Sequence, residues 1–231
     1  MIHLFDLTGE GRLIARTFPD ALLLTHRQEP PKFFTRIGPH DSYDGPVLME
    51  LVRGRRETWM YGLALLQPFL REPRSLAQVI DFFESGAEHT RSTKRKTLAQ
   101  SLLPWKPMLG EMAYAVGGPD LEERHPFIIH DLSGLPLEFA RSWFSIWVHR
   151  EFLKGLVGKP SNVLQRALVI LQGDAMFGKE FAETTGSAAF SLTKRMLMLQ
   201  KFGWGIIMLA QQPSELDQVL RNACAIPLCF S

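Results

Sequence analysis

The sequence contains few residues of the kinds that hold secreted or metal-stabilised proteins together. Only two of its 231 residues are cysteines, Cys224 and Cys229. Their odd separation along an extended segment would direct the two thiols to opposite faces, which disfavours a disulfide. There is no Cys-x-x-Cys pair and the seven histidines are scattered. We therefore expect two buried, reduced thiols and no bound metal.

An excess of charge of one sign and long apolar runs are missing as well. The chain has 26 Lys and Arg against 24 Asp and Glu, a net charge of +2, which excludes a histone-like or strongly acidic protein. Apolar stretches such as Ala21–Leu24 and Met196–Leu199 are far too short to cross a bilayer. The amino terminus has no basic-then-apolar leader pattern. These features predict a cytoplasmic protein without membrane insertion.

The sequence does have an alternation of two kinds of segment. Short apolar runs rich in β-branched residues predict strands at Ile2–Leu7, Ala21–Thr25, Phe127–Asp131, Ala167–Leu171, Gly205–Ala210 and Ile226–Phe230. Several are apolar almost throughout, which is typical of strands buried on both faces of a parallel sheet.

Helical spacing of apolar residues marks the longer segments between these strands. It predicts helices at Leu137–Val157, with Trp147 and Leu156 on one apolar stripe, at Ser187–Phe202 and from Pro213 onward. The stretch Val47–Met112 is helical in pattern but interrupted by prolines. We therefore expect one three-layer α/β domain over residues 1–231, with a mostly parallel sheet and a helical insertion at 44–116, after the second strand.

Polar residues at the carboxyl ends of the predicted strands are the first candidates for a functional site, because ligands of open α/β sheets bind there. They are Asp6, Asp131, Gln172, Asp174, Gln211 and Gln212. Asp6 and Asp131 each precede a glycine-containing turn. Each is therefore either a site residue or a structural cap of the next helix.

A second candidate site is the run from Gly173 to Glu180, which follows a strand. It matches the phosphate-binding pattern G-x-x-x-x-G-K, so that Gly173, Gly178 and Lys179 would hold a nucleotide. Glu180 replaces the hydroxyl residue that normally ligates Mg²⁺, and such loops usually follow the first strand of the sheet. Nucleotide binding through this run stays an alternative.

A basic run from Arg91 to Lys96 contains the triplet Lys94, Arg95 and Lys96, near the start of a predicted helix. It indicates either a solvated helix face or a patch that contacts nucleic-acid phosphates. No aromatic residue is interleaved with the run, so it lacks the stacking platform of single-strand binders.

Three segments, in order along the chain, resemble the HerA family of DNA-translocating ATPases. They are Phe5-Asp6-Leu7-Thr8-Gly9-Glu10-Gly11, Phe127-Ile128-Ile129-His130-Asp131-Leu132-Ser133-Gly134-Leu135-Pro136 and the stretch 201–216, which ends Gln211-Gln212-Pro213-Ser214-Glu215-Leu216. They are similar to the family's D-P-H-G-E-Y, I-I-D-L-S-G-L-P and R-K-F-G-V-G…Q-R-P-S-E-L segments. The wider FtsK–HerA class includes conjugation and type IV secretion ATPases.

The resemblance implies a RecA-like core in a ring that pulls DNA through its centre, powered by ATP and Mg²⁺, with a nuclease or a secretion protein as partner. Gln211 would sense the γ-phosphate or position the attacking water. Asp174 would take the position of the catalytic acid, and Asp131 would lie near the active face of the ring.

The sequence also departs from the family pattern. No phosphate loop precedes Ile2–Leu7, and Gly173 stands where the family has a metal-binding acid. We therefore expect a divergent or truncated motor domain that does not hydrolyse ATP alone and needs no cofactor as a single chain. The alternative is a non-catalytic module that docks to a ring ATPase or secretion partner. The missing first strand predicts an unpaired sheet edge at Ile2–Leu7. That edge would lead to self-association or ring assembly, or would be covered by the helical insertion.

Overall fold

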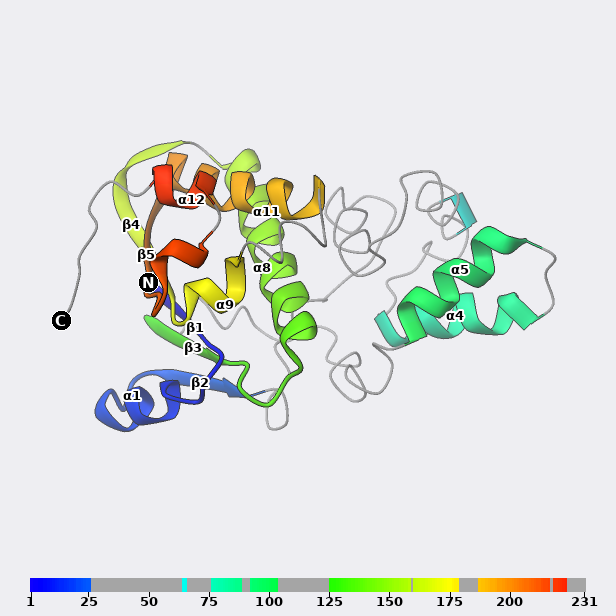
Figure 1. Ribbon diagram of the computed structural model, residues 1–231, viewed down its shortest axis with the longest axis horizontal. Coiled ribbons are helices and arrows are strands. Elements are labelled where there is room, and N and C mark those ends of the chain that lie inside the picture. Colours follow the sequence, from blue (N-terminus) through cyan, green and yellow to red (C-terminus); the bar gives the residue numbers. More distant parts are fainter. Residues whose placement is uncertain are drawn as a thin grey trace. The chain divides into compact units, whose positions relative to one another are not determined.

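The computed structural model describes residues 1–25, 64–65, 76–88, 92–103, 125–158, 160–178, 187–216 and 218–223 (Figure 1). The chain divides into two compact units, Met1–Leu23 with Glu122–Ser231, and Leu24–Leu121. The predicted insertion, 44–116, falls inside the second unit. Both cysteines and the predicted strand Ile226–Phe230 lie outside the described residues. No described helix combines the length and apolar character needed to cross a membrane.

The first unit is built on a five-stranded sheet. Its strands are β1 (Ile2–Asp6), β2 (Leu22–Thr25), β3 (Phe127–Asp131), β4 (Ser161–Ile170) and β5 (Phe202–Met208), in the order β2-β3-β1-β4-β5. β1 runs parallel to β3 and to β4, and β4 runs parallel to β5. Together with the helices on its two faces, this sheet confirms the predicted three-layer α/β fold.

The strand β1 is central, so the prediction of an unpaired edge at Ile2–Leu7 is wrong. Leu4 pairs with Ile129 of β3 on one side and with Val169 of β4 on the other. Phe5 is fully buried. The expectation assumed that a strand preceding Ile2–Leu7 in the family would have been its neighbour in the sheet. Instead, the crossovers to β3 and to β4 place those strands on opposite sides of β1.

One face of the sheet packs against the long helix α8 (Leu137–Val157). Side chains alternate along β1, and His3 and Phe5 face this helix. The Phe5 ring meets Phe144 and Trp147 edge-on, at centroid distances of 4.8 and 4.9 Å. Trp204 of β5 meets Trp147 edge-on at 5.3 Å. An aromatic cluster therefore fills the layer between the sheet and α8.

The opposite face is covered by the short helix α1 (Gly11–Thr17) over β1 and β3. Ile14 and Ala15 pack against Leu4 and Ile129.

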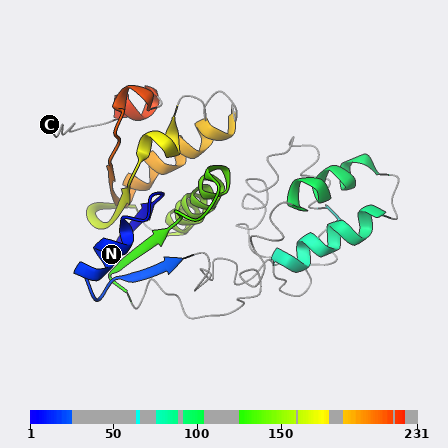
Figure 2. The same ribbon diagram turned by 60° about the horizontal axis from the view of Figure 1, so that its bottom comes forward.

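Figure 2 shows α8 and α11 (Ser187–Met198) running side by side, an arrangement in agreement with their contacts. The remaining described elements of this unit are α9 (Gly173–Phe177), two 3₁₀ turns, η4 (Leu199–Lys201) and η5 (Pro213–Glu215), and α12 (Gln218–Ala223).

Within the second unit, the structure describes a pair of packed helices. These are α4 (Leu76–Glu88) and α5 (Thr93–Leu102), which follow β2 in the chain and lie within the range of the predicted insertion. Ser92 caps α5 by accepting a hydrogen bond from the Arg95 amide at 3.4 Å. Ile80, Phe83, Leu98 and Leu102 are buried.

Candidate functional site

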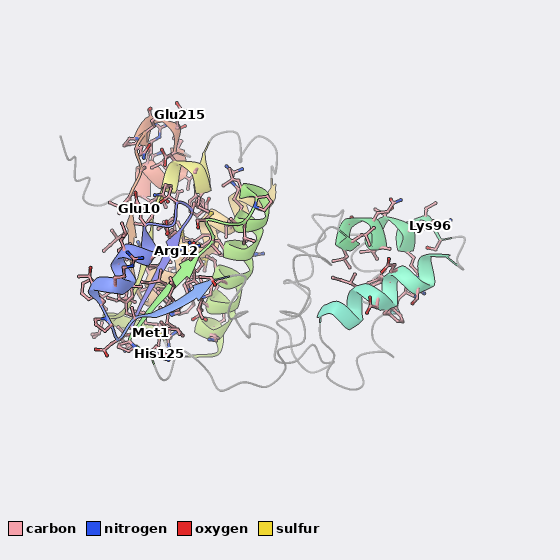
Figure 3. The ribbon with its side chains drawn as sticks, turned by 90° about the horizontal axis from the view of Figure 1, so that it is seen from below. Met1, Glu10, Arg12, Lys96, His125 and Glu215 are labelled. Carbon is pink, nitrogen blue, oxygen red and sulfur yellow. The ribbon has the colours of Figure 1, made fainter. Side chains whose placement is uncertain are left out.

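The carboxyl ends of β1, β3, β4 and β5 form one edge of the sheet, because these strands are parallel. In Figure 3, Met1 and His125, which precede β1 and β3, lie toward the opposite end of the sheet from Glu215, which follows β5. The polar residues singled out in the sequence lie along this carboxyl edge of the sheet. In doubly wound folds this is where ligands bind.

Asp6 ends β1 and is fully buried. Its Oδ1 accepts hydrogen bonds from the Thr8 amide at 2.9 Å and from the Thr8 hydroxyl at 3.1 Å. Its Oδ2 accepts one from the Gly11 amide at 2.7 Å. These contacts satisfy a donor at the start of α1 and fix the turn that leads into it, which is the capping role.

Asp131 lies beside Asp6 in register, at the end of β3. It accepts hydrogen bonds from the Ser133 amide at 3.1 Å and hydroxyl at 2.6 Å, and from Arg12 Nε at 2.6 Å. Burial works to raise the pKa of Asp131, but the bonds from Ser133 and Arg12 outweigh it and the pKa falls below its ordinary value. Asp131 is therefore an ionised carboxylate at neutral pH, paired with Arg12.

Gln172, which follows β4, connects the carboxyl end of β4 to the turn after β1. Its φ of 55° makes it the one non-glycine residue with a positive φ in the described part of the chain. Its Oε1 accepts a hydrogen bond from the Leu7 amide at 3.3 Å, and its Nε2 donates to the Thr8 hydroxyl at 3.2 Å. The unusual backbone conformation thus accompanies a direct bond between the β4 end and the turn after β1.

The structure brings Asp174 close to the segment that contains Gln211. Asp174 lies in the first turn of α9, and its Oδ2 accepts a hydrogen bond from the Gln212 amide at 3.0 Å. The Gly173 amide donates to the Leu209 carbonyl at 2.6 Å, and the Leu209 amide donates to the Ile170 carbonyl at 2.9 Å. The candidate acid and the candidate glutamine are therefore held on adjacent strand ends, with Gln211 exposed.

The run from Gly173 to Gly178 is mostly helical. Gly173 opens α9, and a Cβ on it would lie 2.2 Å from Met208 Cγ. Gly178 forms an isolated antiparallel bridge with Leu216. The Gly173 amide is engaged with Leu209, as described above, and is not directed at a ligand. Lys179 and Glu180 lie outside the described residues, so the phosphate-loop hypothesis stays a prediction.

Two arginines that the strand-end argument missed hold this edge together. Arg12 pairs with Asp131, and this hydrogen bond and charge raise the Arg12 pKa. Arg141 of α8 donates to the Ala175 carbonyl through Nε at 3.0 Å and Nη2 at 2.6 Å, which fixes α9 against α8. Both arginines lie in helices that follow a strand-end acid, and this shared position is the signal that could have identified them.

The basic triplet is divided in the structure. Arg95 Nη2 donates to the Phe82 carbonyl of α4 at 2.9 Å, and its guanidinium lies 4.8 Å from the centroid of the Phe82 ring. Arg95 therefore contributes to the packing of α5 on α4. Lys94 and Lys96 are exposed, and the label on Lys96 in Figure 3 marks its place in this helix pair.

The described residues do not by themselves fit a nucleotide with its magnesium ion. No group of three or more His, Cys, Asp or Glu side chains in the described ranges could hold a metal. Asp174 offers one carboxylate, and the backbone amide of Gly173 is already bonded. The other two acids of this edge, Asp6 and Asp131, are held by Gly11 and Arg12. The described residues therefore do not supply the set of donors that a triphosphate requires.

Comparison with solved structures identifies the fold. VirB4 of Thermoanaerobacter pseudethanolicus has a TM-score of 0.55 and 12% identity over 90% of this chain and 62% of that chain. The plasmid coupling protein TrwB, in complex with a non-hydrolysable GTP analogue, has a TM-score of 0.54 and 13% identity over 96% of this chain and 68% of its own.

A second structure of the bacterial conjugative coupling protein, TrwBdeltaN70, has a TM-score of 0.51 and 14% identity over 96% of this chain and 65% of that chain. The chain thus spans less than two thirds of the length of VirB4 and of this form of TrwB. The likeness shows a RecA-like fold. No family model and no curated protein matches the sequence.

Proposed function

We propose that the chain is a divergent motor ATPase domain of the HerA/FtsK type, related to the conjugation and type IV secretion ATPases, that does not hydrolyse ATP by itself. The observation that carries this proposal is the hydrogen bond from the Gln212 amide to Asp174 Oδ2, 3.0 Å long, at the carboxyl edge of a RecA-like sheet. It supports the proposal because it joins Asp174, the proposed acid in α9, to the residue that follows Gln211, the proposed γ-phosphate-sensing glutamine.

Phosphoryl transfer depends on positioning and on electrostatic stabilisation of the transferred group. On this proposal, Asp174 and Gln211 take the positions of the family's catalytic acid and of its γ-phosphate-contacting glutamine. The described residues do not provide the donors that would hold a triphosphate or its Mg²⁺, so we expect this pair alone to be insufficient for turnover. The Gln172–Thr8 and Arg141–Ala175 bonds keep the strand ends and α9 in place.

The proposed biological role is DNA processing or conjugative transfer. TrwB, a plasmid coupling protein, has a similar fold, as does VirB4. On this proposal the chain assembles with itself or into a ring, contacts DNA, and works with a nuclease or a secretion protein. Lys94 and Lys96 are the proposed phosphate contacts of the helical unit.

The test is a thermal melt and a phosphate-release assay, each with and without ATP and Mg²⁺, on the wild type, Asp174→Asn and Lys179→Ala. We expect no turnover by the chain alone. Turnover that Asp174→Asn abolishes would overturn the inactivity but keep Asp174 as the acid. Turnover that Asp174→Asn leaves intact would overturn the assignment of this site.

The melt tests the first alternative, nucleotide binding through the run Gly173–Glu180. A stabilisation by ATP that disappears in Lys179→Ala would assign nucleotide binding to the run Gly173–Glu180 instead. The other alternative is a non-catalytic interaction module. It is favoured by the exposed apolar side chains Ile207 and Leu209 at the end of β5, and it predicts no nucleotide effect in any variant.

A further inference from the structure

The helix α9 is too short to be held by its own hydrogen bonds. It has five residues, Gly173–Phe177, and a helix of this length is a single first turn, which is unfavourable without other contacts. The last four carbonyls of a helix have no partner inside it, so most of the carbonyls of α9 need partners elsewhere. The position of α9, and of Asp174 in its first turn, is therefore set by the neighbouring elements.

One set of contacts joins α9 to the segment 209–216, which follows β5. The Gln212 amide donates to Asp174 Oδ2 at 3.0 Å, and the Gly173 amide donates to the Leu209 carbonyl at 2.6 Å. An antiparallel bridge also links the residue that follows α9 to the last residue of this segment. Both ends of α9 are thus tied to the segment, and any change in the placement of α9 changes the acceptor that the Gln212 amide meets.

A second set of contacts joins α9 to α8. Arg141 of α8 donates to the Ala175 carbonyl through Nε at 3.0 Å and Nη2 at 2.6 Å. Three residues farther along the same face of α8, the Phe144 ring meets the Phe177 ring edge-on at a centroid distance of 5.5 Å. Arg141 therefore makes two charge-assisted bonds to the carbonyl of the residue that directly follows Asp174.

The α8 end of this connection is firmly placed. Phe144 and Trp147 are fully buried in the aromatic layer between α8 and the sheet, where both meet the Phe5 ring. Arg141 itself is half-buried. A guanidinium is planar and directs its donors in a fixed fork, so two bonds to one oxygen define the place of that carbonyl more narrowly than a single bond would. Arg141 thus transfers the position of a buried helix to α9.

We infer that Arg141 is a positioning residue of the proposed site, which acts through α9 to place the Asp174 carboxylate on the Gln212 amide. The inference rests on the proposed function for the importance of Asp174. The connection itself does not depend on that function and is measured without nucleotide. Arg141 touches the backbone of α9 on one side, while the segment after β5 holds the other side.

The experiment is two-dimensional NMR of the full chain, followed at the Gln212 amide, because this proton reports directly on its acceptor, Asp174 Oδ2. Arg141→Met keeps the side-chain stem but removes the donors. The Gln212 amide should then exchange with solvent about tenfold faster than in the wild type. Its proton resonance should move upfield, toward its position in Asp174→Ala, where the acceptor is missing.

Conservative variants separate positioning from packing. Arg141→Lys keeps the charge and a donor but not the fork, so its exchange rate at Gln212 should lie between those of the wild type and Arg141→Met. Asp174→Asn keeps a side-chain oxygen as acceptor and should preserve the bond that Asp174→Ala removes. Arg12→Met removes an arginine of the same sheet edge that is bonded to Asp131 and not to α9. It is the matched control and should leave exchange at Gln212 unchanged.

The double variant that combines Arg141→Met with Asp174→Ala tests whether the arginine acts through the acid. Its Gln212 amide should exchange no faster than that of Asp174→Ala alone, because the bond that Arg141 positions is already absent. A merely structural role of Arg141 would accelerate the exchange further.

The inference is overturned by a Gln212 amide that exchanges at the wild-type rate in Arg141→Met, by an equal acceleration in Arg12→Met, or by a further acceleration in the double variant. Urea unfolding of each variant identifies exchange that occurs through global unfolding. Where Arg141→Met fails to fold, Arg141→Lys decides alone, and a wild-type rate in it overturns the inference. Turnover that Asp174→Asn leaves intact would overturn the proposed function and leave these expectations unchanged.

Discussion

At the level of single residues, the least usual feature is a pair of histidines in the aromatic layer under α8. His3 and His130 are 1% and 2% exposed, and His3 Nδ1 lies 3.1 Å from His130 Nε2. The His130 ring also stacks on Phe5 at a centroid distance of 4.2 Å. One ring must donate and the other accept in this bond, so the pair is compatible with neutral imidazoles.

Acid should therefore destabilise the fold through His130. Burial, and then the nearby His3, lower the pKa of His130 well below 6.5. In the unfolded chain histidine titrates near about 6.5, so below that pH the unfolded state binds a proton that the folded state does not. The free energy of unfolding should fall progressively as the pH drops from about 6.5 toward the folded pKa.

Urea unfolding at pH 7.5, 6.5 and 5.5 measures this linkage, and the matched variant is His130→Phe, which keeps a ring on Phe5. The variant should lose about 1 kcal/mol at pH 7.5 with the histidine bond. Its stability should then depend less steeply on pH than that of the wild type. Parallel profiles for the two proteins would refute the assignment to His130.

A buried carboxylate gives the second prediction at this scale. Glu151 of α8 is 1% exposed and pairs with Lys154 at 2.8 Å and with Arg166 of β4 at 3.2 Å. Glu151→Ala removes the link between helix and strand and leaves the side-chain volume unfilled, so we expect a loss of about 1–3 kcal/mol in urea unfolding. Lys154→Ala, whose side chain is 31% exposed, should cost less than about 1 kcal/mol.

At the level of elements, the junction of β4 and α9 requires a glycine. A Cβ on Gly173 would lie 2.2 Å from Met208 Cγ and 3.2 Å from the Leu209 carbonyl oxygen. Gly173→Ala should therefore displace α9 from the end of β5 and cost about 1–3 kcal/mol. In Gly158→Ala, the nearest contact is 3.4 Å and the effect should be small. Thermal melts of both variants compare the two positions, and equal melting temperatures would contradict the close approach.

The packing of α5 on α4 depends on Arg95, which combines a hydrogen bond to the Phe82 carbonyl with a position over the Phe82 ring. We expect Arg95→Ala to weaken the helix pair by about 1–2 kcal/mol and to speed hydrogen exchange in α5. Lys96→Ala is the control and should leave exchange unchanged. If DNA binding, measured at low salt, falls with Lys96→Ala but α5 exchange does not, the two roles of the basic triplet are separate.

The sequence predicted the elements better than their arrangement. β3 has the predicted bounds, because its five residues are bounded by a proline on one side and a glycine turn on the other. β4 begins at Ser161, earlier than predicted, where its pairing with β5 is irregular and polar residues hide the strand pattern. Leu156 was expected on the buried stripe of α8 but is 55% exposed. The neighbouring residue Gly155, on the stripe that contains Trp147 and Glu151, packs against Phe202 instead.

The candidate site could be predicted as a set of strand ends but not as a set of contacts. Asp174 and Gln212 are 38 residues apart and meet only because β4 and β5 are neighbours. Asp6 and Asp131 lie side by side only because β1 and β3 are neighbours. Buried parallel strands resemble one another in composition, so the sequence does not reveal which strands are adjacent. Arg12 and Arg141 were missed because their partners are set by helix placement.

At the scale of the whole molecule, the central place of β1 sets the expected order of local stability. β1 pairs on both sides, with β3 and β4, whereas β5 is paired only with β4 among the described residues. Amides in a strand that is paired on both sides exchange only when the domain unfolds globally. Amides in outer strands exchange through local openings that cost less free energy. The amides of Leu4 and Phe5 should therefore be among the slowest to exchange, despite their position near the first residue of the chain.

Native-state hydrogen exchange in increasing urea measures this order directly. Leu4 and Phe5 should exchange with the free energy of global unfolding. The Leu209 amide, which donates to the Ile170 carbonyl at the end of β5, should exchange through a smaller local opening. Ile129→Ala, in the core cluster with Leu4, should lower the global value by about 2–5 kcal/mol and carry β1 with it. Rapid exchange across Ile2–Asp6 in a folded protein would show that β1 does not stand between β3 and β4.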